Sequence, residues 1–251
     1  MRNMLIYLTS NDIEKYENIV LLPLASIEDH GKLPLGTDSI ILEHILARIT
    51  EETKSLIVAP PLYYGFSVEH SLSKYTIYLT GQEFINILKH VLLQLSRTFK
   101  GIIMLTTHGG NIWPAYVAAR EVKASRKTKI IIINFWELVK EYLVKVFHLD
   151  YTPLHADPIE TSLLTYCTPS IIKRCDIEVI KKEEFIERLR RRENSRNDDW
   201  ILTPWTSEDH EYIYHGRLYA NIDIGGEIFN YSIMKIREAI ENFKKLLTLQ
   251  I

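Results

Sequence analysis

The sequence contains few cysteines and no excess of charge of either sign. Cys167 and Cys175 are its two cysteines, which is too few for a disulfide framework or a zinc knuckle. Such sparse cysteine usage is typical of chains whose thiols stay reduced, so we expect a cytoplasmic protein. Lysine and arginine number 30 against 32 aspartates and glutamates, a net charge of -2. The absence of a basic excess argues against nucleic-acid binding.

Long hydrophobic runs are also absent. A membrane-spanning helix needs roughly 20 mostly apolar residues, and no run in the sequence approaches that length. Residues 1–13 lack a small-residue cleavage site and are interrupted by Thr9, Ser10 and Asn11, so no export signal is expected. Hydrophobic residues make up 46% of the chain and charged residues 25%, as in ordinary globular proteins. A length of 251 residues fits a single domain spanning residues 1–251.

Short apolar segments alternate with segments of helical periodicity. Apolar side chains recur at helical spacing between residues 38 and 53. Thr80 and Glu83 form a capping-box pattern in front of another such segment. This alternation predicts an α/β fold with a mostly parallel sheet covered on both faces. The expected strands are residues 18–24, 56–59, 102–105 and 130–133, and the expected helices are residues 38–53, 80–99, 112–125 and 226–247.

Carboxylates and imidazoles gather directly after the expected strands, where an open α/β sheet binds its ligands. Glu28 and His30 follow the first strand and share a face if that segment is extended. Asp38 begins the next helix, and His108 follows the third strand. A later segment carries a further group, with His155 and Glu160 among its members.

Two imidazoles with three carboxylates suit a divalent transition metal. Five ligands exceed what one tetrahedral ion with an open position requires, and they fit two ions with one bridging carboxylate. Taken singly, each residue has a plainer interpretation. Glu28 or Asp38 could be a helix cap or a surface charge, His30 a hydrogen-bonded loop histidine, and Asn111 the cap of the following helix.

Several segments together resemble the creatininase family of amidohydrolases. They are EDHG at 28–31, LPLGTD at 33–38, YGFSVEH at 64–70, HGGN at 108–111, HADPIETS at 155–162 and ANIDIG at 220–225. Their order along the chain is the family's order. The resemblance implies a three-layer α/β/α sandwich, two divalent metal ions per chain (Zn, Mn or Fe) and usually a hexamer. It also implies hydrolysis of a non-peptide C–N bond in a small molecule.

The resemblance further assigns roles to individual residues. Glu28 and His108 would hold one ion, His30 and Glu160 the other, and Asp38 would bridge both. The expected catalytic residues are His155, as the proton shuttle, and Glu160. The expected substrate-binding residues are Ser67, Asn111 and Trp136.

The sequence departs from creatininase itself at two places that bear on the site. Creatininase has Tyr-Glu after the metal-binding histidine, and that Glu ligates metal, whereas this chain has Gly109 and Gly110. Glu160 is the candidate replacement for the missing ligand. The family's Phe-Pro-Gly-Thr segment is replaced by residues 72–76, LSKYT, so the pocket wall and the substrate are expected to differ.

The expected activity is hydrolysis of a small cyclic amide or formamide by a metal-bound hydroxide. Within the family, the missing Glu and a heat-adapted composition, poor in glutamine, favour the archaeal deformylase of a formylaminopyrimidine ribonucleotide, an enzyme of riboflavin-derived and deazaflavin cofactor biosynthesis. The alternatives are creatinine hydrolysis and, from another class, a non-catalytic metal-binding scaffold. A third branch, which trims a modified peptide, has no residue here in its favour.

The arginine-rich stretch at residues 181–199 has two interpretations. It is either a solvated helix and loop or a contact for an anionic group such as a substrate phosphate or another subunit. Its arginines are Arg188, Arg190, Arg191, Arg192 and Arg196.

Overall fold

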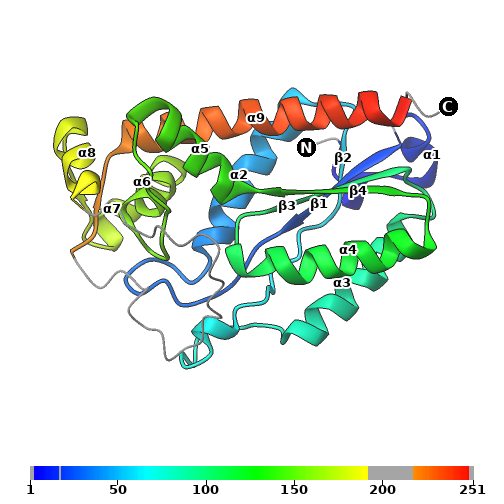
Figure 1. Ribbon diagram of the computed structural model, residues 1–251, viewed down its shortest axis with the longest axis horizontal. Coiled ribbons are helices and arrows are strands. Elements are labelled where there is room, and N and C mark those ends of the chain that lie inside the picture. The colour runs from blue at the N-terminus through cyan, green and yellow to red at the C-terminus, as the bar shows by residue number, and fades with distance from the viewer. Residues whose placement is uncertain (1–2, 17, 192–216, 249–251) are drawn as a thin grey trace.

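The computed structural model describes residues 3–16, 18–191 and 217–248, and these form an α/β fold around a parallel sheet (Figure 1). The central sheet has the strand order β2-β1-β3-β4, and each neighbouring pair runs parallel. Its strands are β1 (Ile19–Leu24), β2 (Ile57–Val58), β3 (Gly101–Thr106) and β4 (Lys129–Asn134). A second, two-stranded parallel sheet pairs β5 (Glu178–Val179) with β6 (Tyr219–Ala220). The expected fold class is therefore confirmed.

Alternating side chains of the buried strands face two separate hydrophobic cores. On β1, Ile19 and Leu21 belong to one core, and Val20 and Leu22 belong to the other. Successive side chains of a strand point to opposite faces, so a strand that is apolar throughout can hold helices on both sides. The long apolar runs of the sequence therefore produce three layers.

The helices divide between the two faces of the sheet (Figure 1). One core contains side chains of α2 (Thr37–Glu52), α5 (Phe135–Phe147) and α9 (Ile222–Thr248). The other core contains side chains of α3 (Gly81–Leu95) and α4 (Ile112–Ser125). The remaining helical elements are α1 (Ser10–Ile13), α6 (Pro158–Cys167), α7 (Ile171–Arg174), α8 (Lys182–Arg190), η1 (Leu5–Tyr7), η2 (Val68–His70) and η3 (Gly109–Asn111).

The capping box predicted for α3 is present. The backbone N–H of Thr80 donates to the Glu83 carboxylate at 2.9 Å, and the Glu83 N–H donates to the Thr80 hydroxyl at 3.4 Å. These bonds satisfy two N–H groups that the first turn cannot use internally. The helix ends at Leu95, earlier than the expected residue 99, and the chain then turns toward β3.

The last helix begins at Ile222, four residues before the expected start at Gly226. The side-chain oxygen of Asn221 accepts the N–H of Ile224 at 2.8 Å and so caps this start. Gly225 lies inside α9, and the residue there must be a glycine because α6 packs directly against its backbone. A Cβ at Gly225 would lie 2.1 Å from the carbonyl oxygen of Ser162. The glycine pair therefore serves close helix packing, and the expected start was wrong for that reason.

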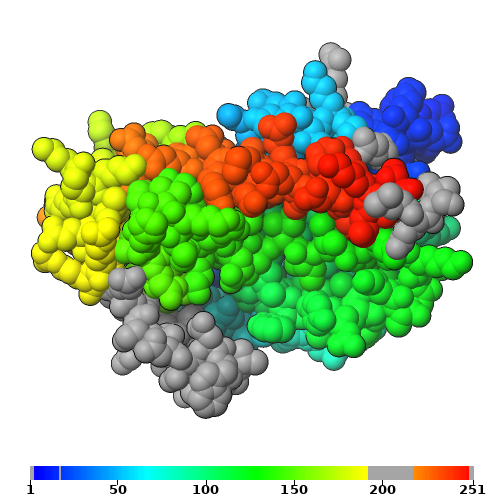
Figure 2. All heavy atoms as spheres, turned by 45° about the horizontal axis from the view of Figure 1, so that its top comes forward, coloured from blue at the N-terminus to red at the C-terminus, as the bar shows by residue number. Residues whose placement is uncertain are grey.

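Figure 2 shows α9 running beside α5 along one face of the molecule.

Within the described part of the chain, no helix is both long and apolar enough to cross a membrane. Cys167 is buried and Cys175 is half-buried, and both thiols are free.

The arginine-rich stretch is described only in part, since Arg192 and Arg196 lie outside the described residues. On α8, Arg188 pairs with Glu184 and Arg191 pairs with Glu187, each one turn earlier on the same helix. Exposed pairs at this spacing are typical of a solvated helix face and contribute only a few tenths of a kcal/mol.

Candidate metal centre

Residues from four distant segments meet at the carboxyl end of the central sheet. β1 and β3 are hydrogen-bonded neighbours with Leu24 opposite Thr106, so the loops that follow both strands leave the sheet side by side. Loops and helix starts then supply the functional groups: Glu28 and His30 after β1, Asp38 in the first turn of α2, His108 after β3, and Glu160 in the first turn of α6. All five side chains are buried, with at most 5% of each residue exposed.

One carboxylate oxygen, Oε1 of Glu28, lies at the centre of the group. It is 3.2 Å from Nδ1 of His108 and 3.4 Å from Nδ1 of His155. It is also 3.8 Å from Nε2 of His70 and 3.9 Å from Nε2 of His30. Four ring nitrogens from separate segments therefore converge on a single carboxylate oxygen.

Asp38 lies between two of these imidazoles. Its Oδ2 is 3.3 Å from Nδ1 of His108 and 3.9 Å from Nε2 of His30, and it accepts a hydrogen bond from the Ser26 hydroxyl at 2.6 Å. Glu160 approaches the same nitrogen of His30 from α6, with Oε1 at 3.7 Å. The Asp38 carboxylate is therefore placed to reach two ligand groups at once.

Three histidines each direct one ring nitrogen outward to a backbone carbonyl. Nδ1 of His30 donates to the carbonyl of Glu28 at 3.0 Å, and Nε2 of His108 donates to that of Phe66 at 2.8 Å. Nε2 of His155 donates to the carbonyl of Asp29 at 2.6 Å. A carbonyl can only accept, so each outward nitrogen carries a hydrogen, and the inward nitrogen keeps the lone pair whenever the ring is neutral. Metal-binding histidines are held in this way.

Burial and neighbouring charges shift the pKa values of the side chains in this cluster. Burial lowers the pKa of His30, but the carboxylates of Glu160, Asp38 and Glu28 outweigh it and raise that pKa to about 10. Burial raises the pKa of Glu160 to about 7. A cation bound among these groups would reverse both effects, because it favours ionised carboxylates and neutral imidazoles.

Several of the inward polar atoms have no hydrogen-bond partner among the described residues. These atoms are Oε1 and Oε2 of Glu28, Nε2 of His30 and Nδ1 of His70. Unpartnered polar atoms are costly when they are buried. Three groups of side chains offer ligand atoms within 4.8 Å of one another: Glu28–Asp38–His108, His30–His155–Glu160 and Glu28–His70–His155. The donor set and its orphaned atoms fit divalent cations.

Asp157 positions Glu160 by capping α6. Its carboxylate accepts hydrogen bonds from the N–H of Glu160 at 2.9 Å, the N–H of Leu154 at 2.9 Å and the hydroxyl of Tyr151 at 2.8 Å. The other oxygen of Glu160, Oε2, accepts the N–H of Ala156 at 2.6 Å. The loop before α6 and the first turn of α6 therefore hold the Glu160 carboxylate toward His30.

Asp157→Ala is expected to lower the free energy of unfolding by about 2–4 kcal/mol. The change removes a helix cap, worth about 1 kcal/mol, and leaves buried donors unpaired at about 1–3 kcal/mol each. Urea denaturation of both proteins measures the difference. Asp150→Ala, which changes an exposed aspartate between α5 and α6, provides the control. A loss below about 0.5 kcal/mol, the usual scatter of surface substitutions, would contradict the capping role.

The three expected substrate-binding residues differ in their placement. The Asn111 amide accepts the N–H of Phe66 at 2.9 Å and donates to the carbonyl of Ala25 at 3.0 Å, so it braces the loops and does not cap α4. These bonds occupy the amide, and we do not propose a substrate contact for Asn111. Ser67 is fully buried, with its hydroxyl 3.2 Å from Nε2 of His108. The half-buried Trp136 donates from its indole N–H to the carbonyl of Thr107 at 2.6 Å.

Glu69 and His70 were missed as site residues at the level of sequence. His70 stacks on His155, with ring centroids 4.0 Å apart, and Oε1 of Glu69 lies 3.6 Å from Nε2 of His108. The Glu-His pair in the segment 64–70 was the available signal, but the segment follows a very short strand and carries no periodicity of its own.

The fold and this cluster define a parallel α/β protein with a buried carboxylate–imidazole site of the type that holds divalent ions. The family model for creatininase (creatinine amidohydrolase) matches residues 7–220. The chain therefore belongs to the creatininase family, as the resemblance implied.

Curated relatives match over part of the chain. The mycofactocin precursor peptide peptidase of Mycolicibacterium smegmatis is 30% identical over 110 residues, which are 41% of this chain and 44% of that protein. The 3-dehydro-scyllo-inosose hydrolase of Thermotoga maritima is 27% identical over 152 residues, 58% of this chain and 49% of that protein. The chain thus spans about half the length of the curated relatives it matches.

Solved structures agree in fold over nearly the whole chain. A crystal structure of creatinine amidohydrolase (creatininase) superposes with a TM-score of 0.71 at 18% identity, covering 96% of this chain and 97% of that chain. A manganese form of creatininase also gives a TM-score of 0.71 at 18% identity, covering 96% and 98%. At this level of identity the likeness establishes the fold.

Proposed function

We propose that the protein is a metal-dependent hydrolase that cleaves a non-peptide C–N bond of a small molecule. One observation carries the proposal: His30, His108 and His155 each donate one N–H to a backbone carbonyl and direct the other nitrogen at buried carboxylates. Such an arrangement is stable for a neutral imidazole that gives its lone pair to a cation. A hydrogen-bonded structural core would instead satisfy the oxygens of Glu28.

The chain offers ligands for two divalent ions. Glu28, Asp38 and His108 would hold one, and His30 and Glu160 would hold the other, with Asp38 shared between them. Bound ions of this kind supply Lewis-acid polarisation of a carbonyl and lower the pKa of coordinated water. Zinc, manganese and iron all accept this mixture of imidazole and carboxylate ligands.

His155 is suited to proton transfer to the leaving nitrogen. Burial lowers the pKa of His155 well below its ordinary value, so its ring is neutral. Its Nε2–H is held by the carbonyl of Asp29, which leaves Nδ1 facing Glu28 to take up and pass on a proton. A buried imidazole that is fixed at one nitrogen and open at the other is the arrangement that general acid–base catalysis requires.

His155→Ala is expected to lower kcat by about a hundred- to ten-thousand-fold, the usual contribution of general acid–base catalysis. Both equivalents of the two-ion site should stay bound, because the ligands named above remain. Steady-state kinetics and elemental analysis of the same preparation measure both quantities. An unchanged kcat would rule out proton transfer by His155, and loss of one of the two tightly bound equivalents would make it a ligand of the His30–Glu160 ion.

One departure from creatininase supports the choice of substrate. We propose a formylaminopyrimidine ribonucleotide, cleaved to release formate, because Gly110 stands where creatininase carries a metal-binding glutamate. Arg188 and Arg191 each pair with a glutamate one turn earlier, so these two arginines add little to the argument for a phosphate. The 30% identity to mycofactocin precursor peptide peptidases favours a second candidate, hydrolysis of a peptide substrate.

The test is a parallel assay of the protein loaded separately with Zn, Mn or Fe. The substrates are the formylaminopyrimidine nucleotide, creatinine and a short unstructured peptide, with formate, creatine and new amino groups as the products measured. We expect formate release that stops on chelation and returns when metal is restored. Peptide cleavage alone would favour the second candidate. Tight metal binding with no turnover of any substrate would favour a non-catalytic scaffold.

A further inference from the structure

His70 is a buried imidazole at the centre that the proposed two-ion site does not use. It lies in the 3-10 helix η2, and 10% of its side chain is exposed. Unlike for His30, no hydrogen bond from the described residues fixes a ring nitrogen of His70, and its buried Nδ1 has no partner among them. Such an atom is costly to bury unless it gains a partner under some condition.

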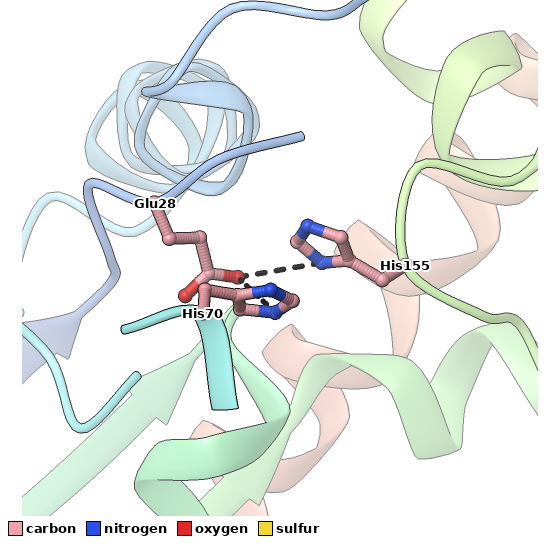
Figure 3. Close-up of side chains that lie close together, drawn as sticks. All are labelled: Glu28, His70 and His155. Carbon is pink, nitrogen blue, oxygen red and sulfur yellow. Dashed lines mark ion pairs between the residues drawn. The ribbon is translucent and has the colours of Figure 1, made fainter. Parts of the chain in front are cut away.

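The ring of His70 faces the same carboxylate as His155. Figure 3 shows both imidazoles beside Glu28 on separate segments of the chain. Oε1 of Glu28 lies 3.8 Å from Nε2 of His70 and 3.4 Å from Nδ1 of His155. The two rings stack at 25°, so their nitrogens reach the carboxylate from the same side of the site. All three ligand atoms lie within 4.8 Å of one another.

This spacing is close to that of a zinc site. Zinc bonds to nitrogen and oxygen of about 2.0–2.2 Å place neighbouring ligand atoms of a tetrahedron about 3.4 Å apart. Two imidazoles with one carboxylate favour zinc or a similar transition metal over magnesium or calcium, which prefer oxygen ligands. Three protein ligands also leave a position for water.

We propose that Glu28, His70 and His155 form a third cation site, weaker than the other two and inhibitory when filled. It is weaker because Glu28 is also a ligand of the Asp38–His108 ion, and a second dication nearby repels the newcomer. Filling the site occupies Nδ1 of His155, the nitrogen assigned to proton transfer. The inhibitory effect therefore rests on the proposed function, whereas the binding of the cation does not.

Zinc binding measured without any substrate tests the site directly. Metal-free protein is titrated with Zn²⁺ by equilibrium dialysis with elemental analysis, on the wild type, His70→Ala and His70→Asn. In the wild type, the most weakly bound zinc equivalent is assigned to this site. We expect its affinity to fall at least about tenfold in both variants, since even losing a group that only contacts a metal ligand costs about 10–100-fold in metal affinity. The more tightly bound equivalents should be kept. His44→Ala, which removes an exposed imidazole on α2, should change nothing.

Two outcomes would overturn the site: every zinc equivalent of the wild type persisting at unchanged affinity in both His70 variants, or an equal loss in His44→Ala. Thermal melting of the metal-free variants checks that they fold. With an active substrate in hand, excess Zn²⁺ should inhibit the wild type and spare His70→Ala, and Mg²⁺ at the same excess should inhibit neither. Absence of turnover would defeat the proposed function and leave the binding result standing.

Discussion

Asp38→Ala should strip the protein of bound metal and abolish turnover. The Asp38 carboxylate is 3.3 Å from Nδ1 of His108 and 3.9 Å from Nε2 of His30, so one side chain serves both ligand groups. Removing a direct ligand should weaken binding by more than the 10–100-fold typical of an outer partner. The measurement is metal content after dialysis, together with activity on the substrate identified above.

Thermal melting of metal-free Asp38→Ala checks that the variant folds, because the change also removes the acceptor of the Ser26 hydroxyl. Asp223→Ala is a matched control, since Asp223 is also the second residue of a helix but is exposed on α9. It removes the same favourable charge from a helix start, worth about 0.3–1 kcal/mol, without touching the site. Near-normal metal content in Asp38→Ala would refute the bridging role.

Gly110→Ala is expected to disturb the site through His108. A Cβ at Gly110 would lie 2.4 Å from the carbonyl oxygen of Phe66, 2.5 Å from Nε2 of His108 and 2.7 Å from Oε1 of Glu69. That carbonyl is the acceptor that fixes the His108 ring. The added methyl group must therefore move the backbone of the 64–70 segment or the ring. We expect stability to fall by about 1–3 kcal/mol, as for other overpacked sites, and metal affinity to fall about 10–100-fold.

Gly109→Ala provides the comparison for this prediction. A Cβ at Gly109 meets nothing within 4 Å, and its φ is not positive, so alanine should be tolerated there. Chemical denaturation and metal titration of the two variants measure the contrast. Equal behaviour of Gly109→Ala and Gly110→Ala would show that close packing over His108 does not hold the site together.

Local rules accounted for much of the fold. The capping box at Thr80 and the apolar strands depend on residues within a few positions of each other, so their patterns could be read directly. The start of α9 could not be read in this way. Gly225 resembles a helix boundary in sequence, and only contact with Ser162 of α6 shows why a glycine is needed inside the helix.

The site residues likewise fall into those that the sequence could identify and those that only tertiary contacts reveal. Chemical type and position after a strand pointed to Glu28, His30 and His108. The helix start pointed to Asp38, the family resemblance pointed to Glu160, and the structure brings all five together. Asn111 was open to two interpretations in sequence, a substrate-binding residue or a helix cap, whereas its amide bonds to backbone groups of residues 25 and 66, far away in sequence. His70 was overlooked, because nothing within its own segment reveals the proximity of Glu28.

By itself, the sequence determined the alternation of strands and helices and the kinds of side chain that follow each strand. These properties follow from hydrophobic periodicity and from the common edge at which parallel strands end. Only the tertiary structure decided which nitrogen of each histidine faces inward, because a backbone carbonyl must lie within reach of the other nitrogen. It likewise decided that His70 joins Glu28 and His155, because such contacts depend on how separate loops pack.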